Sequence, residues 1–326
     1  MPNSSRRAFL ARSVAASAAV TAFGTPLLRP ASAQDLAVLN VAAIPSDISG
    51  SAYYAADNGY FKKGGLSATF LGLTSGAAIA AAVLGGSADV GYSNVISLAI
   101  AHSRGLPITM LFPANMHVHE APTAGLLSVK KSSPITGAKG LNGKVMAVIG
   151  LNNIADIAAR AWIDKNGGDS KTVKSVELPF PEMKAALEAD RIDAAVLDTT
   201  ADPLLGKPGD TLRLIASTFD AVSTHFAPSV WFSTTDWVSK HPAVAKAFVA
   251  AMRESAVWAN GHHRESAEIL SKYTHVTPAQ INTFVRATYG DRLTAEEIQP
   301  NIDVAAKYGV IKAAFPAADV ISSVAG

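Results

Sequence analysis

Residues 38–47 read VLNVAAIPSD, and a helix-like stretch follows over residues 50–61. The run up to Ile44 is mostly apolar and rich in branched side chains, as in a buried strand, and Pro45, Ser46 and Asp47 end it. A strand, a short polar loop and a helix form one β-loop-α unit. Because such units recur along the chain, we predict an α/β fold with parallel sheets covered by helices on both faces.

The same pattern predicts the other elements. Further strands are expected at residues 68–71, 88–92, 108–112, 124–129, 144–149, 175–178, 192–197 and 226–233. Helices are expected at residues 77–84, 95–104, 154–166, 182–189, near 202, and at 243–259, 266–273, 278–289 and 302–308.

Two strand-like runs, at residues 124–129 and 227–233, interrupt the β-loop-α rhythm. They enclose about 100 residues, which is the size of one small α/β lobe. We therefore expect a discontinuous first lobe of residues 34–122 and 226–326, with residues 123–225 inserted as the second lobe. Ligands of open α/β sheets lie at the carboxyl ends of the strands, so two facing lobes would form a cleft that closes over a small molecule.

The composition of the chain excludes several classes of protein and function. Of the 326 residues, 49% are hydrophobic and 17% are charged, which excludes disorder for the bulk of the chain. The formal charge is +2, but the first 33 residues carry four arginines and no acid, and without them the net charge becomes −2. A nucleic-acid partner is therefore not expected. Cysteine is absent, so disulfides, thiolate metal sites, a cysteine nucleophile and a lipoprotein anchor are not expected either.

The N-terminal segment has the features of an export signal. Residues 5–10 read SRRAFL, an uncharged run covers residues 14–23, and Ala31, Ser32 and Ala33 form a small-residue cleavage site. The adjacent arginines resemble the twin-arginine signal, although an ordinary secretory signal or a surface helix would share some of these features. The apolar run is much shorter than the about 20 residues of a membrane-crossing helix. We expect cleavage near Ala33 and a mature protein that is free in the periplasm, without a membrane anchor.

Several short motifs resemble one protein family. They are SAYYAADNGYF at residues 51–61, LGGSADVG at 84–91, GLNGKV at 140–145, and AALE at 185–188 with IDAA at 192–195. Their order and spacing resemble the solute-binding proteins of ABC importers of the nitrate/sulfonate/taurine type, and also relatives that bind pyrimidine precursors. The resemblance extends over nearly all of the mature chain.

This resemblance implies a two-lobed periplasmic-binding-protein fold of type II, the Venus-flytrap fold. It also implies a monomeric substrate-binding component that needs no cofactor. Such a protein captures a small organic solute, whether a sulfonate, another organic anion or a heterocycle, and delivers it to an ABC permease and its ATPase. Family membership does not fix which of these ligands is bound.

Loops at the expected strand ends supply the site candidates. The ligand-binding candidates are Ser46, Asp47, Ser75, Gly76, Ala77, Tyr92, Ser93, Asn94, His117, Asn152, Asn153, Phe180, Asp198, Thr199 and His225. Ser75, Gly76 and Ala77 open a helix with a capping hydroxyl and small side chains, so a ligand could reach the backbone amides there; an ordinary N-cap is the alternative. Tyr92, Ser93 and Asn94 offer a ring, a hydroxyl and an amide, or simply a second cap.

The second lobe offers a matching set. Asn152 and Asn153 occupy an equivalent strand-to-helix turn, where capping is again the alternative, and Phe180 could form an apolar wall. These loops contain no lysine or arginine, so an anion would be held by neutral donors and helix dipoles. Asp47 and Asp198 could instead meet a cationic or NH-bearing group, which would make a zwitterion or a heterocycle the better ligand. Either carboxylate could also simply cap a turn.

Two other interpretations remain open. His117 and His119 share one face of an extended segment, as metal ligands can, but no third ligand follows at a fixed spacing; polar contacts near the first lobe crossing are the alternative, and His225 lies before the second. An exported enzyme on the same fold is the rival function. Ser128 starts an S-x-x-K match, yet it lies in an apolar strand, and the cysteine-rich motif of pyrimidine-precursor synthases cannot occur here.

Overall fold

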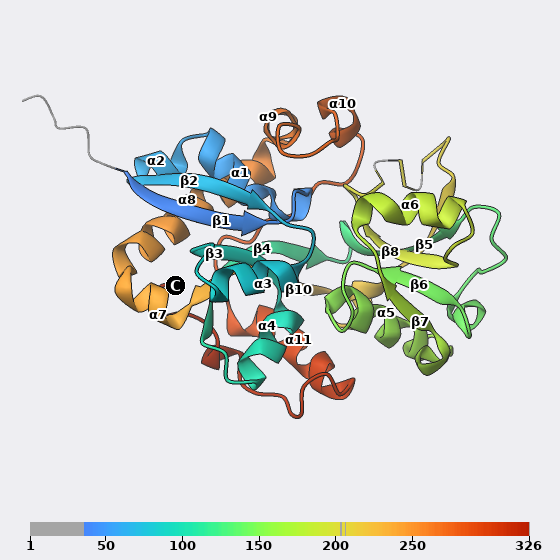
Figure 1. The fold of residues 1–326 in the computed structure, drawn as a ribbon. Coiled ribbons are helices and arrows are strands. Elements are labelled where there is room, and N and C mark those ends of the chain that lie inside the picture. The colour runs from blue at the N-terminus through green and yellow to red at the C-terminus, as the bar shows by residue number, and fades with distance from the viewer. Residues whose placement is uncertain (1–35, 203, 206, 326) are drawn as a thin grey trace, which may run out of the picture. The chain divides into compact units, whose positions relative to one another are not determined.

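A computed structural model describes residues 36–202, 204–205 and 207–325, and the expected export signal lies outside these residues. Two five-stranded sheets form the fold (Figure 1). The first has the order β2 (Leu66–Gly72), β1 (Ala37–Ala43), β3 (Val90–Asn94), β10 (His225–Thr234) and β4 (Ile108–Val118). The second has the order β7 (Lys174–Glu177), β6 (Val145–Val148), β8 (Ala194–Asp198), β5 (Ala124–Lys130) and β9 (Leu212–Ser217).

Helices connect and cover these strands. They are α1 (Gly50–Asp57), α2 (Tyr60–Lys63), α3 (Gly76–Leu84), α4 (Val95–Ser103), α5 (Ile154–Lys165), α6 (Phe180–Glu188), α7 (Thr235–Lys240), α8 (Pro242–Gly261), α9 (His263–Leu270), α10 (Pro278–Ile281) and α11 (Ala295–Lys307). The second sheet has a separate apolar core on each face, one shared with α5 and one with α6 (Figure 1). None of the helices among the described residues is long and apolar enough to span a membrane.

The prediction of parallel sheets is correct for three strands of each sheet, and the other strands make both sheets mixed. Strands β1, β2 and β3 are parallel, as are β6, β7 and β8. Strand β10 is antiparallel to both β3 and β4, and β5 is antiparallel to β8 and β9. The antiparallel strands β5 and β10 are those that interrupt the β-loop-α rhythm. Neither strand is connected to its neighbour in the sheet by a crossover helix. Because parallel pairing requires such a crossover connection, these two strands can pair antiparallel.

Several element boundaries also differ from prediction. The expected helix at residues 50–61 is two helices, because Gly59 has a φ of +77°, which breaks the helical path. None of the described residues around residue 202 is helical, and the helix expected at 278–289 ends at Ile281. Strand β4 continues to Val118 despite Pro113, which an edge strand tolerates because one side of it needs no ladder hydrogen bonds.

The strands of the second sheet all lie between residues 124 and 217, whereas β10 returns to the first sheet. The chain therefore passes from the first sheet to the second after β4 and back again before β10. The exact lobe limits predicted above, 34–122 with 226–326 and 123–225, stay a prediction.

Candidate functional site

Two adjacent cavities lie between residues of the two sheets. The inner cavity has a volume of about 50 Å³. Its lining includes the backbone of Gly76 and the polar or aromatic side chains of Tyr92, Asn94, Asn115, Asn153, Phe180, Phe219 and Ser229. The outer pocket has a volume of about 400 Å³, and its lining includes Ser46, Thr74, Phe180, Asp198, Thr200 and residues 273–276. Ile44, Ile149 and Phe180 line both. The volume of the outer pocket is typical of small-molecule sites.

Three helices begin at the inner cavity. The side chains of Ser75, Asn94 and Asn153 cap α3, α4 and α5, accepting hydrogen bonds from backbone N–H groups at 3.3, 2.9 and 3.1 Å. Gly76, Asn94 and Asn153 line the cavity itself. Because the N-terminal end of a helix carries partial positive charge, three such ends around one small space favour a negatively charged or oxygen-rich group there.

The absence of a side chain at residue 76 allows the start of α3 to pack closely against Ser93 and Asn94. A Cβ atom at Gly76 would lie 2.8 Å from Ser93 Oγ and 3.3 Å from Asn94 Nδ2. Tyr92 also lines the inner cavity, and its hydroxyl donates to Ser229 Oγ at 2.9 Å. Burial raises the pKa of Tyr92, so its hydroxyl stays neutral. This bond joins β3 to β10 and fixes the ring that lines the cavity.

Asp198 and Ser46 are two polar residues of the outer pocket whose side chains are buried. Asp198 is fully buried, and its Oδ1 accepts the N–H of Ala201 at 2.7 Å, while its Oδ2 has no partner. Ser46 Oγ is also buried without a partner. Burial raises the pKa of the Asp198 carboxyl to about 7, and the bond from Ala201 opposes that shift. The pocket therefore contains hydrogen-bonding capacity that the protein itself does not use.

This raised pKa predicts a pH-dependent effect of Asp198→Asn. In the folded protein the carboxyl titrates near 7, whereas in the unfolded chain its pKa is about 3.9. Between these values the folded state holds the proton more tightly, so the free energy of unfolding of the wild type falls as pH rises through this window. The asparagine variant lacks this loss.

We expect its stability relative to the wild type to increase from pH 4 to pH 7 and then to level off. Urea unfolding at pH values from 4 to 8 measures this difference. Asp190→Asn is the matched control, because the Asp190 side chain is 76% exposed and its substitution should give a flat difference. A flat profile for Asp198→Asn as well would contradict the assigned titration.

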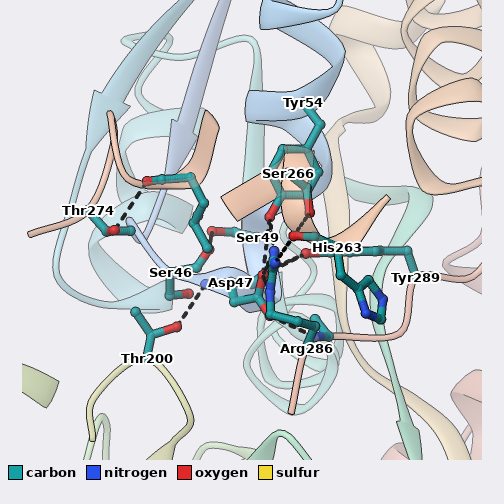
Figure 2. Close-up of polar contacts among 12 residues, drawn as sticks. Ser46, Asp47, Ser49, Tyr54, Thr200, His263, Ser266, Thr274, Arg286 and Tyr289 are labelled. Atoms are coloured by element: carbon teal, nitrogen blue, oxygen red, sulfur yellow. Dashed lines mark hydrogen bonds and ion pairs between the residues drawn. The ribbon is translucent and has the colours of Figure 1, made fainter. Parts of the chain in front are cut away.

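Asp47 has a different role in the structure, because its carboxylate is already fully engaged (Figure 2). Its Oδ1 accepts from Arg286 at 2.8 Å and from the Tyr54 hydroxyl at 3.1 Å, and its Oδ2 accepts the Ala287 N–H at 2.6 Å. Asp47 is 0% exposed and lines neither cavity. This geometry favours anchoring of the first loop over direct ligand contact.

The backbone of the same loop reaches the second sheet. The Asp47 N–H donates at 3.0 Å to Oγ1 of Thr200, a residue that lines the outer pocket (Figure 2). The Ile154 N–H at the start of α5 donates to Asn94 Oδ1 at 3.4 Å, and both residues line the inner cavity. Residues of the two sheets are therefore hydrogen-bonded to each other at both cavities.

The remaining predicted site residues line neither cavity. Ser93 is buried behind Gly76, and Thr199 is buried with its Oγ1 unpartnered. Ala77 and Asn152 are exposed. His225 is exposed as well, and its Nε2 is 3.8 Å from Glu297 Oε1. The structure thus brings Ser46, Gly76, Tyr92, Asn94, Asn153, Phe180 and Asp198 to the cavities.

His117 on β4 contacts residues close to β10, so it joins the two segments at which the chain passes between the sheets. Its Nε2 lies 2.9 Å from Asp220 Oδ1, and its ring packs against Phe219 and Phe226. His119 Nδ1 is 3.1 Å from the same oxygen. Burial lowers the pKa of His117, which favours the neutral ring. Within the part of the chain that the structure describes, no group of three or more His, Cys, Asp or Glu side chains is placed to hold a metal ion.

Some lining residues were not predicted. Asn115 and Ser229 are polar residues within β4 and β10, and both line the inner cavity. A polar residue inside an otherwise buried strand is a signal that could have identified them. Residues 273–276, by contrast, follow α9 and reach the outer pocket only through the tertiary fold.

Two mixed sheets with a cleft between them define a periplasmic-binding-protein fold, and solved structures agree. The aliphatic sulphonate binding protein SsuA of Escherichia coli is 15% identical with a TM-score of 0.68, and the match covers 88% of this chain and 92% of that one. The nitrate-binding protein NrtA of Synechocystis PCC 6803 is 14% identical with a TM-score of 0.72, covering 89% and 87%. The predicted fold class is therefore confirmed.

Sequence similarity identifies the family. The chain matches the NMT1/THI5 like family over residues 49–266 and belongs to it. The taurine-binding periplasmic protein of Escherichia coli (strain K12) is 31% identical over 198 residues, which are 59% of this chain and 58% of that protein. The match thus spans less than two thirds of that relative's length. The resemblance to solute-binding proteins of the nitrate/sulfonate/taurine type is confirmed.

Proposed function

We propose that this protein is the substrate-binding component of an ABC-type import system. It captures a small organic solute in the periplasm and delivers it to a membrane permease. The observation that carries the proposal is the pair of cavities lined by both sheets, with hydrogen bonds between the sheets at each. A ligand enclosed there contacts both sheets at once, so it favours the closed arrangement by its differential affinity for it.

The relatives support the same proposal. Their names give taurine, aliphatic sulphonates and nitrate as the bound solutes, and all three act in the periplasm. We further propose that residues 34–122 with 226–326 and residues 123–225 act as two lobes. We also propose that the protein is exported through the twin-arginine pathway and cleaved near Ala33. It acts as a monomer, and the permease works with an ATPase.

An enzyme on this fold is not favoured. The relatives are binding proteins, and the S-x-x-K serine does not lie at either cavity. Ser128 is fully buried on β5, and its hydroxyl donates to the Leu126 carbonyl at 3.2 Å. Such a hydroxyl has neither access to a substrate nor an adjacent base, both of which nucleophilic catalysis requires.

Thermal unfolding of the mature chain from Gln34 tests the proposal. The panel contains nitrate, alkanesulfonates, amino sulfonates, aromatic carboxylates and pyrimidines. A ligand at 100 times its Kd should add about 2.7 kcal/mol to the free energy of unfolding. Stabilisation by one chemical class supports the receptor function, and no stabilisation by any class contradicts it.

Thr200→Val tests the contact between the sheets. The substitution removes the oxygen that accepts the Asp47 N–H, which costs the closed arrangement about 1 kcal/mol, or roughly a fivefold loss of affinity. Calorimetric titration with a stabilising compound from the panel measures the loss. Thr199→Val is the matched control, because Thr199 Oγ1 has no partner to lose. Equal losses in the two variants would contradict the role of the Thr200 contact.

A further inference from the structure

Three ionisable side chains meet where the chain passes between the two sheets. His117 lies on β4 and His119 just after it, while Asp220 belongs to a short 3-10 helix, η4 (Thr218–Ala221), that precedes β10. His117 Nε2 and His119 Nδ1 both contact Asp220 Oδ1, at 2.9 and 3.1 Å. An ionised carboxylate only accepts hydrogen bonds, so each of these nitrogens has to carry a proton.

The two sides of this cluster belong to different halves of the fold. Strand β4 is an edge strand of the first sheet, whereas η4 packs against α5 and β5 of the second half. The Thr218 hydroxyl donates to the Gly125 carbonyl on β5 at 2.9 Å, and the Phe219 ring occupies the space that a side chain at Gly125 would need. The contact between His117 and Asp220 therefore crosses from one half of the fold to the other.

The cluster is connected to the inner cavity through Phe219. This residue lines the cavity, and its ring packs edge-to-face on the His117 ring with the centroids 5.6 Å apart. The Phe226 ring on β10 packs against His117 as well, at 5.4 Å. The His117 side chain is only 1% exposed as a result. A movement of η4 away from β4 would uncover the His117 ring and shift Phe219 in the cavity wall.

The His117 ring is neutral while it is covered in this way. Burial lowers its pKa and outweighs the opposing effect of Asp220, and positive charge on His119 or His225 lowers it further. His119 is exposed, and its hydrogen bond to Asp220 raises its pKa. As the pH falls, His119 therefore takes up a proton before His117 does, and its charge opposes protonation of the buried ring.

Other titratable and charged groups lie on the elements around the cluster. Glu120 acts on His119, and Glu297 on α11 lies 3.8 Å from His225 Nε2. The elements that pack against β4 or η4 also carry Asp47 on η1 (Asp47–Ser49), His102 on α4, Asp156, Arg160, Asp164 and Lys165 on α5, and Lys246, Arg253 and Glu254 on α8. Asp47 is paired with Arg286, and Glu254 with Lys63. Asp220 is thus the carboxylate that meets His117.

We propose that His117 is a positioning residue that couples closure of the two lobes over the ligand to pH. Its neutral ring, bonded to Asp220, holds η4 and therefore Phe219 in the wall of the inner cavity. A protonated ring favours the arrangement in which η4 has moved away and water reaches the imidazole. The inference rests on the proposed function and adds a regulation to it, because the ligand is held at neutral pH and released more readily in acid.

The direction of the effect follows from the different exposure of His117 in the two arrangements. In the open arrangement the hydrated ring has its ordinary pKa of about 6.5, and in the closed arrangement its pKa is lower. Between these two values the open arrangement binds more protons. Ligand affinity therefore falls as the pH falls through this window, by at most about tenfold per pH unit.

Calorimetric titration between pH 5.5 and 7.5, with a compound from the panel that stabilises the protein, measures the coupling. His117→Gln retains an N–H donor for Asp220 but does not titrate. Over this range we expect the wild type to lose about three- to tenfold more affinity than the variant. Asp198 and the compound titrate with both proteins, so their effects cancel in the ratio of the two dissociation constants. His241→Gln, a change at an exposed histidine, should keep the wild-type profile.

The outcomes separate the inference from the proposed function. A ratio of dissociation constants that stays constant with pH would overturn the inference and leave the receptor function intact. If no compound of the panel binds at any pH, the proposed function fails, and the inference fails with it.

Asp220→Asn tests the coupling with a different expected outcome. Asparagine keeps an acceptor for His117 but removes the negative charge that favours its protonation, so the pKa of His117 in the closed arrangement should fall further. The loss of affinity in acid should then persist and extend to lower pH, whereas His117→Gln removes it. Identical pH profiles for the two variants would show a merely structural contact and overturn the inference. Urea unfolding checks that both variants are folded, and the backbone bond from the His119 N–H to the Thr224 carbonyl is untouched in each.

Discussion

Replacement of Arg286 with alanine is expected to lower the free energy of unfolding by about 3–5 kcal/mol, because it would leave a buried carboxylate without its cation. The Arg286 side chain is 5% exposed, and that of Asp47 is 0% exposed. Arg286 Nε and Nη2 both donate to this carboxylate, and Nη1 donates to the His263 carbonyl. The substitution therefore removes the cation that links the first loop to the C-terminal part of the chain, and the Ala287 N–H and the Tyr289 hydroxyl remain as donors to Asp47.

Urea unfolding measures the loss, and Lys63→Ala provides the control. Lys63 pairs with Glu254 at 2.8 Å, but the two side chains are 70% and 44% exposed, so its loss should cost less than about 1 kcal/mol. A double variant, Asp47→Asn with Arg286→Met, should recover part of the stability because neither charge is then buried alone. Similar losses for Arg286→Ala and Lys63→Ala would contradict the structural role of the pair.

Replacement of Gly76 with valine is expected to weaken ligand binding by at least about 100-fold, which corresponds to about 2.7 kcal/mol. The added Cβ would lie 2.8 Å from Ser93 Oγ and 3.3 Å from Nδ2 of Asn94, and both Gly76 and Asn94 line a cavity of only about 50 Å³, so the substitution would displace part of its lining. The nearest atom is the end of a serine side chain, which can rotate, so the effect on folding should be much smaller than the effect on binding.

Calorimetric titration with a stabilising compound, together with urea unfolding, separates the two effects. Ala77→Val is the matched control, since the next residue on the same helix is exposed and should tolerate the change. Unchanged affinity in Gly76→Val would show that the ligand occupies the outer pocket alone. It would thereby contradict the part of the proposed function that places the ligand in both cavities.

Much of the fold could be predicted from local sequence. The run before Pro45 became β1, and the stretches at residues 77–84 and 154–166 became α3 and α5 within one residue at each end. Strand direction could not be predicted in this way, because a hydrophobic run is compatible with either direction. Residues 212–217 were missed as a strand since Arg213 interrupts the apolar run, although they pair along β5. The sequence of residues 282–289 predicts a helix. In the structure, two of their backbone N–H groups instead donate hydrogen bonds to the side chains of Asp47 and Asn260.

The site shows the same division between local and long-range information. Helix caps are local features, so Ser75, Asn94 and Asn153 could be predicted from the sequence. The partner of Asp47 is 239 residues away, and no local pattern indicates that this carboxylate is already engaged. Asp198 was predicted with Asp47 as a possible ligand contact, yet only the structure distinguishes the two, because one has a full set of partners and the other has a free oxygen.

The position of β10 determines the order in which the protein can form during synthesis. This strand lies between β3 and β4, and it is synthesised after every strand of the second sheet. The second sheet comes from one continuous segment, so it can assemble as soon as residue 217 has left the ribosome. Until residues 225–234 follow, β3 and β4 have no strand between them to hold them in one sheet. The half of the fold that starts the chain is therefore completed last, after a long loop has been closed.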